Sequence, residues 1–268
     1  MLTSRSLEDR MATASRAARA GGTLLREKLG TDIGVRSKDV RSNLVTEADT
    51  QSEALIRRMI ANEFPADALL GEETGASGNS ELARWIVDPL DGTTNYSHGY
   101  RCFCVSIAFE MAGVVELGVI YDPMAGEEYC ARRGHGASCN GEPIRVSVQD
   151  DLRDTLLVTG FPAHRVDDPV GNLRPFAEFM AKAQAIRRDG SAALDLCYVA
   201  GGRLDGFWEP GLHAWDIAAG ALIVEEAGGR VSDYSGRQAQ LDAGEIVASN
   251  GKVHEAMLAV LRPYAGGA

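Results

Sequence analysis

The chain of 268 residues is 45% hydrophobic and 24% charged, which is ordinary for a globular protein and sufficient for one large domain or two modest halves. Its net charge of -11 argues against a nucleic-acid-binding surface as the main function. The charge does not exclude an anionic substrate, because bound metal ions can invert the local field.

Three sequence features bear on cellular location. No hydrophobic run is long enough to cross a membrane, and residues 1–9 are polar and acidic, unlike a signal peptide. The five cysteines lack the spacing of a disulfide framework, which predicts reduced thiols. We therefore expect a cytoplasmic protein without a membrane partner. The cysteines are Cys102, Cys104, Cys130, Cys139 and Cys197.

The chain begins with two predicted helices. Apolar spacing predicts a long amphipathic helix over residues 7–29, in which Gly21-Gly22 permits close packing. Residues 36–46 are polar and predict a loop or hairpin. A second helix begins at Thr46, and Thr46 with Asp49 fits a capping box, which would make Asp49 structural. The apolar face of this second helix is formed by Leu55, Ile56, Met59 and Ile60.

Two short apolar runs, at residues 68–70 and 85–87, read as buried strands that end in carboxylates. The first runs into Glu72, and the second is stopped at Asp88-Pro89, because proline has no N–H to donate. Asp91-Gly92 then turns the chain. Adjacent strands ending at one edge would bring these acids together. Two such charges about 4 Å apart repel by about 4 kcal/mol at an effective dielectric of about 20, so the cluster favours a hard cation such as Mg²⁺ or Mn²⁺.

Later elements alternate between strands and helices, which indicates a mixed α and β fold. Strands are predicted at 105–110 and 114–121, joined by a turn at Ala112-Gly113, and at 127–131, 144–148, 156–160 and 205–209. Helices are predicted at 173–184, with Phe176, Phe179 and Met180 inward, from Gly190-Ser191 onward, at 216–227 and at 253–261. A soft boundary near residues 149–151 divides residues 1–150 from 151–268.

The segment Asp88-Pro89-Leu90-Asp91-Gly92-Thr93-Thr94-Asn95 resembles the signature of the inositol monophosphatase family of metal-dependent, lithium-sensitive phosphatases. Gly71-Glu72-Glu73 precedes it, and the stretches 215–220 and 225–229 follow it in the family's order. Residues 188–192 and Glu209 look closest to the bacterial inositol-1-monophosphatase branch. The resemblance implies an α/β (α+β) fold, a layered α-β-α-β-α sandwich shared with fructose-1,6-bisphosphatase. Its active site would lie between two halves of one compact catalytic unit.

The resemblance also implies a metal centre. Glu72, Asp88 and the carbonyl of Leu90 would hold a first Mg²⁺, and Asp88, Asp91 and Asp216 a second. Glu72 would touch a third, weaker ion through water, and Mn²⁺ is a substitute for Mg²⁺. Residues 1–150 would thus carry most of the ligands, and residues 151–268 would supply Asp216.

Other residues would serve the reaction and the substrate. Thr93, with Asp49 behind it, resembles the pair that orients and deprotonates the attacking water, with Glu72 as the further catalytic acid. The backbone of Gly92, Thr93 and Thr94 would bind phosphate oxygens. The substrate's polyol side would face Gly190, Ser191, Ala192, Glu209 and Asp216. From the residues alone, Glu209 is equally an exposed strand-end acid, Glu73 equally structural, and His213 more simply structural.

The implied activity is Mg²⁺-dependent hydrolysis of inositol 1-phosphate, or a similar phosphorylated polyol, by a metal-activated water in a homodimer. Histidinol-phosphate phosphatase and fructose-1,6-bisphosphatase, of the same family, are the enzyme alternatives. A different class of function is a protein that keeps the fold and binds the transcription machinery. No direct contact with nucleic acid is expected in either case.

Overall fold

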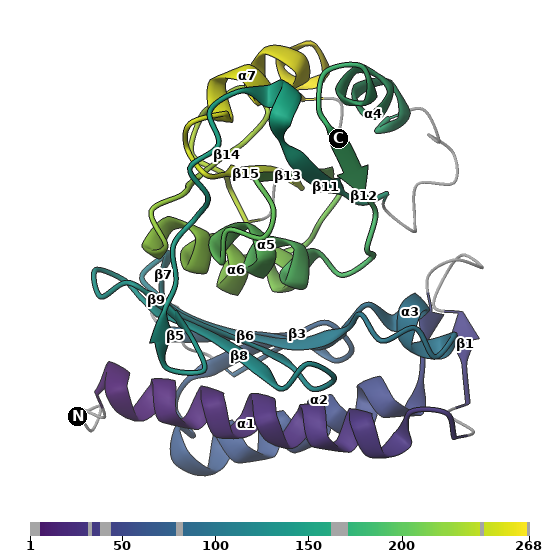
Figure 1. The fold of residues 1–268 in the computed structure, drawn as a ribbon. Helices are drawn as coiled ribbons and strands as arrows, with labels where there is room; N and C mark the ends of the chain where they lie inside the picture. Colours follow the sequence, from purple (N-terminus) through teal and green to yellow (C-terminus); the bar gives the residue numbers. More distant parts are fainter. Residues whose placement is uncertain are drawn as a thin grey trace.

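The computed structural model describes residues 6–31, 34–37, 44–78, 83–161, 171–241 and 244–266. Within them, helical layers and sheets alternate in the order α-β-α-β-α, which confirms the predicted layered sandwich (Figure 1). The helices are α1 (Leu7–Lys28), α2 (Glu47–Glu63), α3 (Thr93–Ser97), α4 (Leu173–Met180), α5 (Ala192–Ala200), α6 (Ala214–Glu226) and α7 (His254–Leu261). Single 3-10 turns are η1 (Leu152–Asp154) and η2 (Arg262–Tyr264).

The described strands form two large sheets and one small hairpin. The first sheet has the order β10-β9-β8-β7-β6-β5-β3-β4, and the second β12-β11-β13-β15-β14. The first contains β3 (Ala68–Gly71), β4 (Gly75–Ser77), β5 (Ala83–Asp91), β6 (Cys104–Met111), β7 (Val114–Asp122), β8 (Glu127–Arg132), β9 (Ala137–Cys139) and β10 (Glu142–Pro143). The second contains β11 (Leu156–Thr159), β12 (Ala185–Arg187), β13 (Gly206–Pro210), β14 (Arg230–Ser232) and β15 (Glu245–Ser249). The hairpin pairs β1 (Arg36–Ser37) with β2 (Leu44–Val45), and the residues between them lie outside the described ranges.

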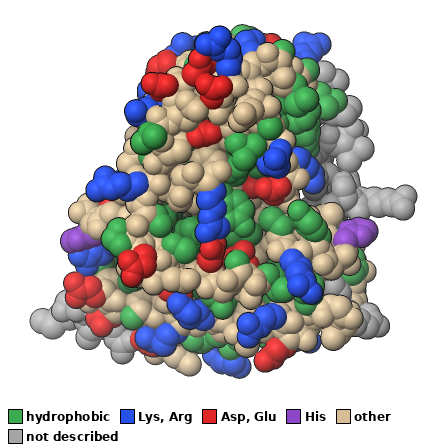
Figure 2. Space-filling view, viewed as in Figure 1, with side chains coloured by type: hydrophobic (Ala, Val, Ile, Leu, Met, Phe, Trp, Pro, Cys, Tyr) green, Lys and Arg blue, Asp and Glu red, His purple; other side chains and the backbone are tan. Residues whose placement is uncertain are grey.

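Helices cover both faces of each large sheet. α1 and α2 pack on the outer face of the first sheet, whereas α5 and α6 fill the space between the sheets and α4 and α7 lie beyond the second. Gly22 allows α1 to lie close to β7, because a Cβ at Gly22 would be only 2.6 Å from the ring of Tyr121. None of the described helices combines the length and hydrophobicity needed to cross a bilayer. Figure 2 shows acidic and basic side chains interspersed over one face of the molecule.

The sequence predicts that the strand before the signature stops at its proline, and this prediction is wrong. β5 continues through Pro89 to Asp91. Its register on β6 shifts between the pairs Asp88–Ser106 and Asp91–Cys104, which places one extra residue on β5. A bulge leaves a residue without a ladder partner, so the missing N–H of Pro89 costs no sheet hydrogen bond there.

Two other predicted features are wrong, and a third is incomplete. Residues 144–148 are not a strand: β10 ends at Pro143, and Val148 in the extended segment that follows is 77% exposed. The helix predicted over 173–184 ends at Met180, which is 57% exposed, because the chain then turns into β12. On α2, Ile56, Met59 and Ile60 pack in the core as predicted, but the buried face also holds the polar Ser52 and Glu53, which the predicted apolar face did not include.

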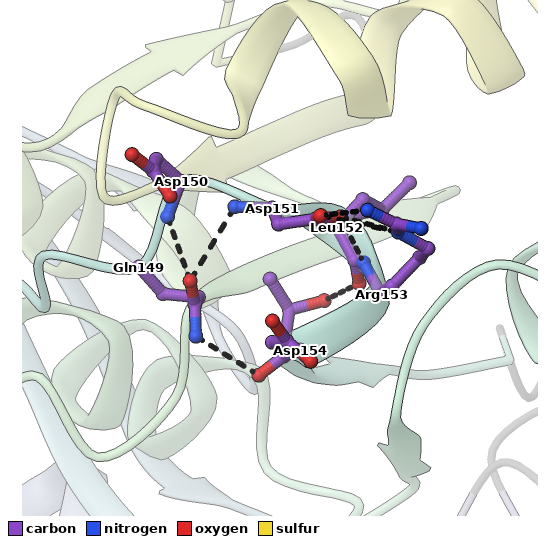
Figure 3. Close-up of polar contacts among 7 residues, drawn as sticks. Gln149, Asp150, Asp151, Leu152, Arg153 and Asp154 are labelled. Carbon is purple, nitrogen blue, oxygen red and sulfur yellow. Dashed lines mark hydrogen bonds and ion pairs between the residues drawn. The ribbon is translucent and has the colours of Figure 1, made fainter.

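The connection between the two sheets is held by its own hydrogen bonds (Figure 3). The side-chain oxygen of Gln149 accepts from the N–H groups of Asp150 and Asp151, and its amide donates to the carbonyl of Asp154. Asp151 caps η1 through the N–H of Arg153. The predicted soft boundary is therefore a short, internally bonded link.

A partly buried arginine ties α1 to the first sheet. The guanidinium of Arg10 lies between the rings of Phe64 and Phe109, at 4.5 and 4.6 Å from their centroids. It pairs with Asp67, 3.0 Å away, whose side chain is only 3% exposed. Asp67 also accepts from the indole N–H of Trp85 at 3.0 Å. Both charges are thus compensated within an aromatic setting.

We expect Asp67→Asn to lower the free energy of unfolding by about 3–5 kcal/mol, because it removes an almost fully buried carboxylate charge that pairs with the guanidinium of Arg10. Arg16→Gln is the control, since the Arg16–Glu63 pair is 53% and 38% exposed and should cost at most about 1 kcal/mol. Urea unfolding of the two variants measures both values. Equal losses in the two variants would contradict the importance of burial.

Candidate active site

Asp49 makes two sets of contacts at the start of α2. Its Oδ2 accepts from the N–H and hydroxyl of Thr46, at 2.9 and 2.5 Å, which closes the predicted capping box. Its Oδ1 lies 3.0 Å from the hydroxyl oxygen of Thr93, which is also 3.1 Å from the carbonyl of Leu90. Burial raises the pKa of Asp49 to about 6. The same carboxyl therefore caps a helix and contacts the residue expected to orient water.

The end of β5 is fixed by short local bonds. The Oδ1 of Asp88 accepts from the N–H of Leu90 at 2.9 Å. The hydroxyl of Ser52 donates to the carbonyl of Pro89 at 3.1 Å. Gly92, with a φ of +97°, then turns the chain into α3. A Cβ at Gly92 would lie 2.8 Å from the carbonyl of Cys102, so the turn requires glycine.

Asp91 links the first sheet to the helices between the sheets. Its Oδ2 accepts from the hydroxyl of Ser191 at 2.6 Å and from the N–H of Ala193 at 2.8 Å, at the start of α5. Ser191 is buried and caps α5 through the N–H of Leu194. The structure thus places Ser191 behind Asp91, as a support for that carboxylate.

A third aspartate approaches from α6. The Oδ2 of Asp216 accepts from the N–H of His213 at 2.7 Å, and the exposed ring of His213 stacks on Trp215. Asp88, Asp91 and Asp216 each bring a carboxylate oxygen within 4.8 Å of the other two. The bonds above use one oxygen of each aspartate. Because a carboxylate has two oxygens with about four acceptor positions, all three groups keep acceptor positions for a shared ligand.

The negative charges of this cluster repel one another. Burial, followed by the charges of Glu72, Asp91 and Asp216, raises the pKa of Asp88 well above its usual value. Burial also raises the pKa of Asp91 to about 6 and that of Asp216 well above its usual value. A divalent cation would remove this repulsion, and carboxylate oxygens are the ligands preferred by Mg²⁺. The residues present therefore fit the metal centre that the sequence predicts.

Glu72 reaches the cluster from the neighbouring strand. β3 pairs in parallel with β5, with Gly71 opposite Val87, and the N–H of Glu72 donates to the carbonyl of Val87 at 3.2 Å. The charge of Glu72 contributes to the raised pKa of Asp49 and of the three aspartates. The predicted meeting of the two strand ends is confirmed.

A cleft of about 180 Å³ opens beside these acids, between residues of both sheets. Eight predicted site residues line it: Glu72, Asp91, Gly92, Thr93, Thr94, Gly190, Ala192 and Glu209. The other predicted site residues do not line it: Asp49, Asp88, Leu90, Ser191 and Asp216. The wall also contains residues that the sequence analysis did not assign: Leu44, Asn95, Gly160, Phe161, Arg188 and Leu212.

Asn95 joins the two sides of this cleft. Its amide donates at 2.8 Å to the carbonyl of Cys102 and at 2.8 Å to that of Asp189. Asn95 ends the signature and Arg188 opens the 188–192 stretch, so both could have been found from these motifs. No local pattern signals Gly160 or Phe161, which reach the cleft through the second sheet.

Glu209 is a buried acid, 7% exposed, and not the exposed strand-end acid that the residues alone allowed. Gly160 makes room for it, because a Cβ there would lie 2.1 Å from its carboxyl. Burial and the charge of Asp91 raise the pKa of Glu209 to about 8, against the opposing effect of Arg188. In the cation-free protein this side chain is therefore mainly a neutral acid at pH 7.

None of the five cysteines forms a disulfide. The thiol of Cys104 lies 3.8 Å from Asp91 and 3.7 Å from the hydroxyl of Ser191. Burial raises the pKa of Cys104 and of Cys102, so both stay protonated at neutral pH. Thiolates are the form that binds metals or attacks electrophiles, which leaves these residues as packing groups beside the acids.

Comparison with known proteins agrees with this geometry. Residues 6–265 match the inositol monophosphatase family. The Nus factor SuhB of Pseudomonas aeruginosa is 44% identical over 259 residues, covering 94% of this chain and 95% of that protein. The inositol-1-monophosphatase of Mesorhizobium japonicum is 48% identical, covering 82% and 83%. The crystal structure of the extragenic suppressor protein suhB from Bartonella henselae superposes with a TM-score of 0.90 at 39% identity, covering 94% and 98%. This chain belongs to the inositol monophosphatase family.

Proposed function

We propose that this protein hydrolyses a small phosphate monoester in a Mg²⁺-dependent reaction, with inositol 1-phosphate as the first candidate substrate. The observation that carries the proposal is the convergence of Asp88, Asp91 and Asp216 beside a cleft. The relative from Mesorhizobium japonicum named inositol-1-monophosphatase supports the choice of substrate. Histidinol phosphate and fructose 1,6-bisphosphate are the alternatives within the family.

For the metal ligands we propose the assignment that the family resemblance implies. Glu72, Asp88 and the carbonyl of Leu90 would hold one Mg²⁺, and Asp88, Asp91 and Asp216 a second, with a third weaker ion near Glu72. Bound Mg²⁺ would neutralise the phosphate and lower the pKa of a water molecule. Because Asp91 and Asp216 come from the two predicted halves, residues 1–150 and 151–268 would work as one catalytic unit.

The chain's own groups would handle the proton and the substrate. The hydroxyl of Thr93 would accept from the attacking water while it donates to Asp49, so the released proton has an acceptor 3.0 Å away. The N–H groups at the start of α3, from Gly92 to Thr94, would hold phosphate oxygens. On the opposite wall, Glu209 would face the hydroxyls of the polyol.

A second candidate function is binding to the transcription machinery. The relative from Pseudomonas aeruginosa, 44% identical, is named a Nus factor. This role and hydrolysis are compatible, because a partner could bind outside the cleft. An Asp91→Asn protein would separate them: retained binding of transcription proteins in a pull-down, with hydrolysis lost, would assign the protein both roles. We also propose a homodimer, which sedimentation analysis would test.

We expect phosphate release to require Mg²⁺ and Asp91→Asn to abolish it, because the change removes a charged oxygen from the cluster. The measurement is a panel of inositol 1-phosphate, histidinol phosphate, fructose 1,6-bisphosphate and adenosine 3′,5′-bisphosphate. Millimolar Li⁺ should inhibit, as in the family. Asp122→Asn is the control, since Asp122 is also buried and bonds two backbone N–H groups, of Met124 and Ala125. Full activity in excess chelator would refute the metal-dependent mechanism.

Asp49→Asn should lower kcat by about 10²–10⁴-fold, because asparagine keeps the shape but is a poor proton acceptor. After Thr93→Ala has broken the contact, adding Asp49→Asn should cost little more. The measurements are kcat and melting temperature for both single variants and the double. Asp9→Asn, which alters the capping box of α1, controls for helix stability. Near-native kcat in Asp49→Asn would leave Asp49 as a helix cap only.

The raised pKa of Glu209 predicts a pH effect on stability. Between its usual value of 4.5 and about 8, the folded protein keeps a proton that the unfolded chain has lost. The contribution of Glu209 to the free energy of unfolding of the wild type should therefore fall as pH rises from 4.5 to about 8, and stay constant above about 8. The glutamine of Glu209→Gln does not titrate. In the presence of chelator, the free energy of unfolding of Glu209→Gln minus that of the wild type should therefore increase as pH rises through this range. Parallel curves for the two proteins would show that the acid is not buried as described.

A further inference from the structure

The inward face of α2 carries three polar residues that touch three different parts of the acidic site. Ser52 and Glu53 follow Asp49 by three and four residues. The three side chains therefore share one face of the helix, and all are fully buried. Asp49 contacts Thr93, and Ser52 contacts the carbonyl of Pro89. Glu53 contacts the turn that contains Glu72, and the mechanism proposed above gives it no role.

Glu53 holds this turn through several hydrogen bonds. Its Oε2 accepts from the N–H of Glu73 at 2.8 Å. Its Oε1 accepts from the N–H of Thr74 at 3.1 Å and from the Thr74 hydroxyl. The Nε of Arg57 donates to the same oxygen at 2.9 Å. All of these partners are donors, so the site suits a charged carboxylate and no neutral group of the same shape.

The turn is also enclosed on its remaining sides. A Cβ at Gly71 would lie 2.7 Å from both carboxyl oxygens of Glu53, so the carboxylate fills the space beneath Gly71. Arg57 extends past Glu53 to the carbonyl of Gly75 at 2.6 Å and the hydroxyl of Ser77 at 2.8 Å. The residues on both sides of Glu72 are therefore fixed to α2.

We propose that Glu53 is a positioning residue that holds Glu72 in place for the divalent cation. The proposal rests on the proposed metal-dependent function. Without a cation, the charge of Glu72 repels those of Asp49 and Asp88, which would move an unsupported turn outward. The clamp formed by Glu53 and Arg57 opposes that movement, so the cation meets a ligand that needs no rearrangement.

The test is Glu53→Gln, which keeps the shape but offers one acceptor oxygen and brings an NH₂ group against the N–H groups of Glu73 and Thr74. Mn²⁺ affinity is measured by calorimetry without substrate, followed by the Mg²⁺ concentration at half-maximal rate. Affinity for the cation should weaken by about 10–100-fold, the usual effect of losing a residue that orients a ligand. At saturating Mg²⁺, kcat and the KM for inositol 1-phosphate should stay within about threefold of the wild type.

Two further variants make the result decisive. Thr74→Ala removes one hydrogen-bond donor to Glu53 from an exposed residue and should weaken Mn²⁺ binding by a few-fold. If Glu53→Gln does not fold, this variant tests whether Glu53 positions Glu72. Glu63→Gln is the control, because Glu63 lies on the same helix but bonds Thr13 and Arg16 of α1. Its Mn²⁺ affinity should equal that of the wild type.

Unchanged Mn²⁺ affinity in folded Glu53→Gln, or a loss confined to kcat, would overturn the proposal. If the wild type binds Mn²⁺ but hydrolyses no phosphate ester, the proposed function fails while the comparison of Mn²⁺ affinities still decides the role of Glu53. If the wild type binds no Mn²⁺, both fail.

Discussion

Mutual repulsion between buried carboxylates is the constraint on which the rest of this structure depends. Asp88, Asp91 and Asp216 bring oxygens within 4.8 Å of one another, and Glu72 adds a fourth charge. At an effective dielectric of about 20, two charges about 4 Å apart repel by about 4 kcal/mol. The fold must hold these groups together against that repulsion.

Hydrogen bonds at the N-terminal ends of three helices stabilise carboxylates of the site. The capping boxes and N–H groups at the beginnings of α2, α5 and α6 bond Asp49, Asp91 and Asp216, one oxygen each. A helix start carries a partial positive charge, worth about 0.3–1 kcal/mol to a nearby anion. Three such starts converge from two layers, α2 from outside the first sheet and α5 and α6 from between the sheets, which also makes the cleft suited to an anionic substrate.

The hydrogen-bonding pattern explains why capping and catalysis need not exclude each other. In each of Asp88, Asp91 and Asp216, one oxygen is bound to the protein and the second remains for another ligand. A carboxylate has enough acceptor positions for both purposes. For Asp49, the structural and the functional interpretation of the sequence describe two oxygens of one side chain.

Local patterns predicted the elements well where local physics decides them. The turn at Ala112-Gly113 has both residues at positive φ, and the Thr46 cap begins α2 at the expected residue. The proline rule failed at Pro89 because a bulge, which depends on the neighbouring strand, removed the need for its N–H. The helix predicted over 173–184 ended early because its last residues join a strand of the second sheet.

The acidic cluster could be predicted because its residues lie in recognisable motifs at strand and helix ends. Glu53 could not be found in this way, since a glutamate within an amphipathic helix usually faces water. Its burial depends on Gly71 and on the N–H groups of a turn about 20 residues away. Gly160 and Phe161 likewise reach the cleft only through the packing of the second sheet.

Crystals soaked in Mn²⁺ would test the central claim most directly, because anomalous scattering identifies the ion at its position. We predict a Mn²⁺ peak bound by carboxylate oxygens of Asp88, Asp91 and Asp216, with no rearrangement of the bonds that hold their other oxygens. A cluster that stays free of Mn²⁺ at millimolar concentration, or that binds the ion only after these bonds break, would contradict the account.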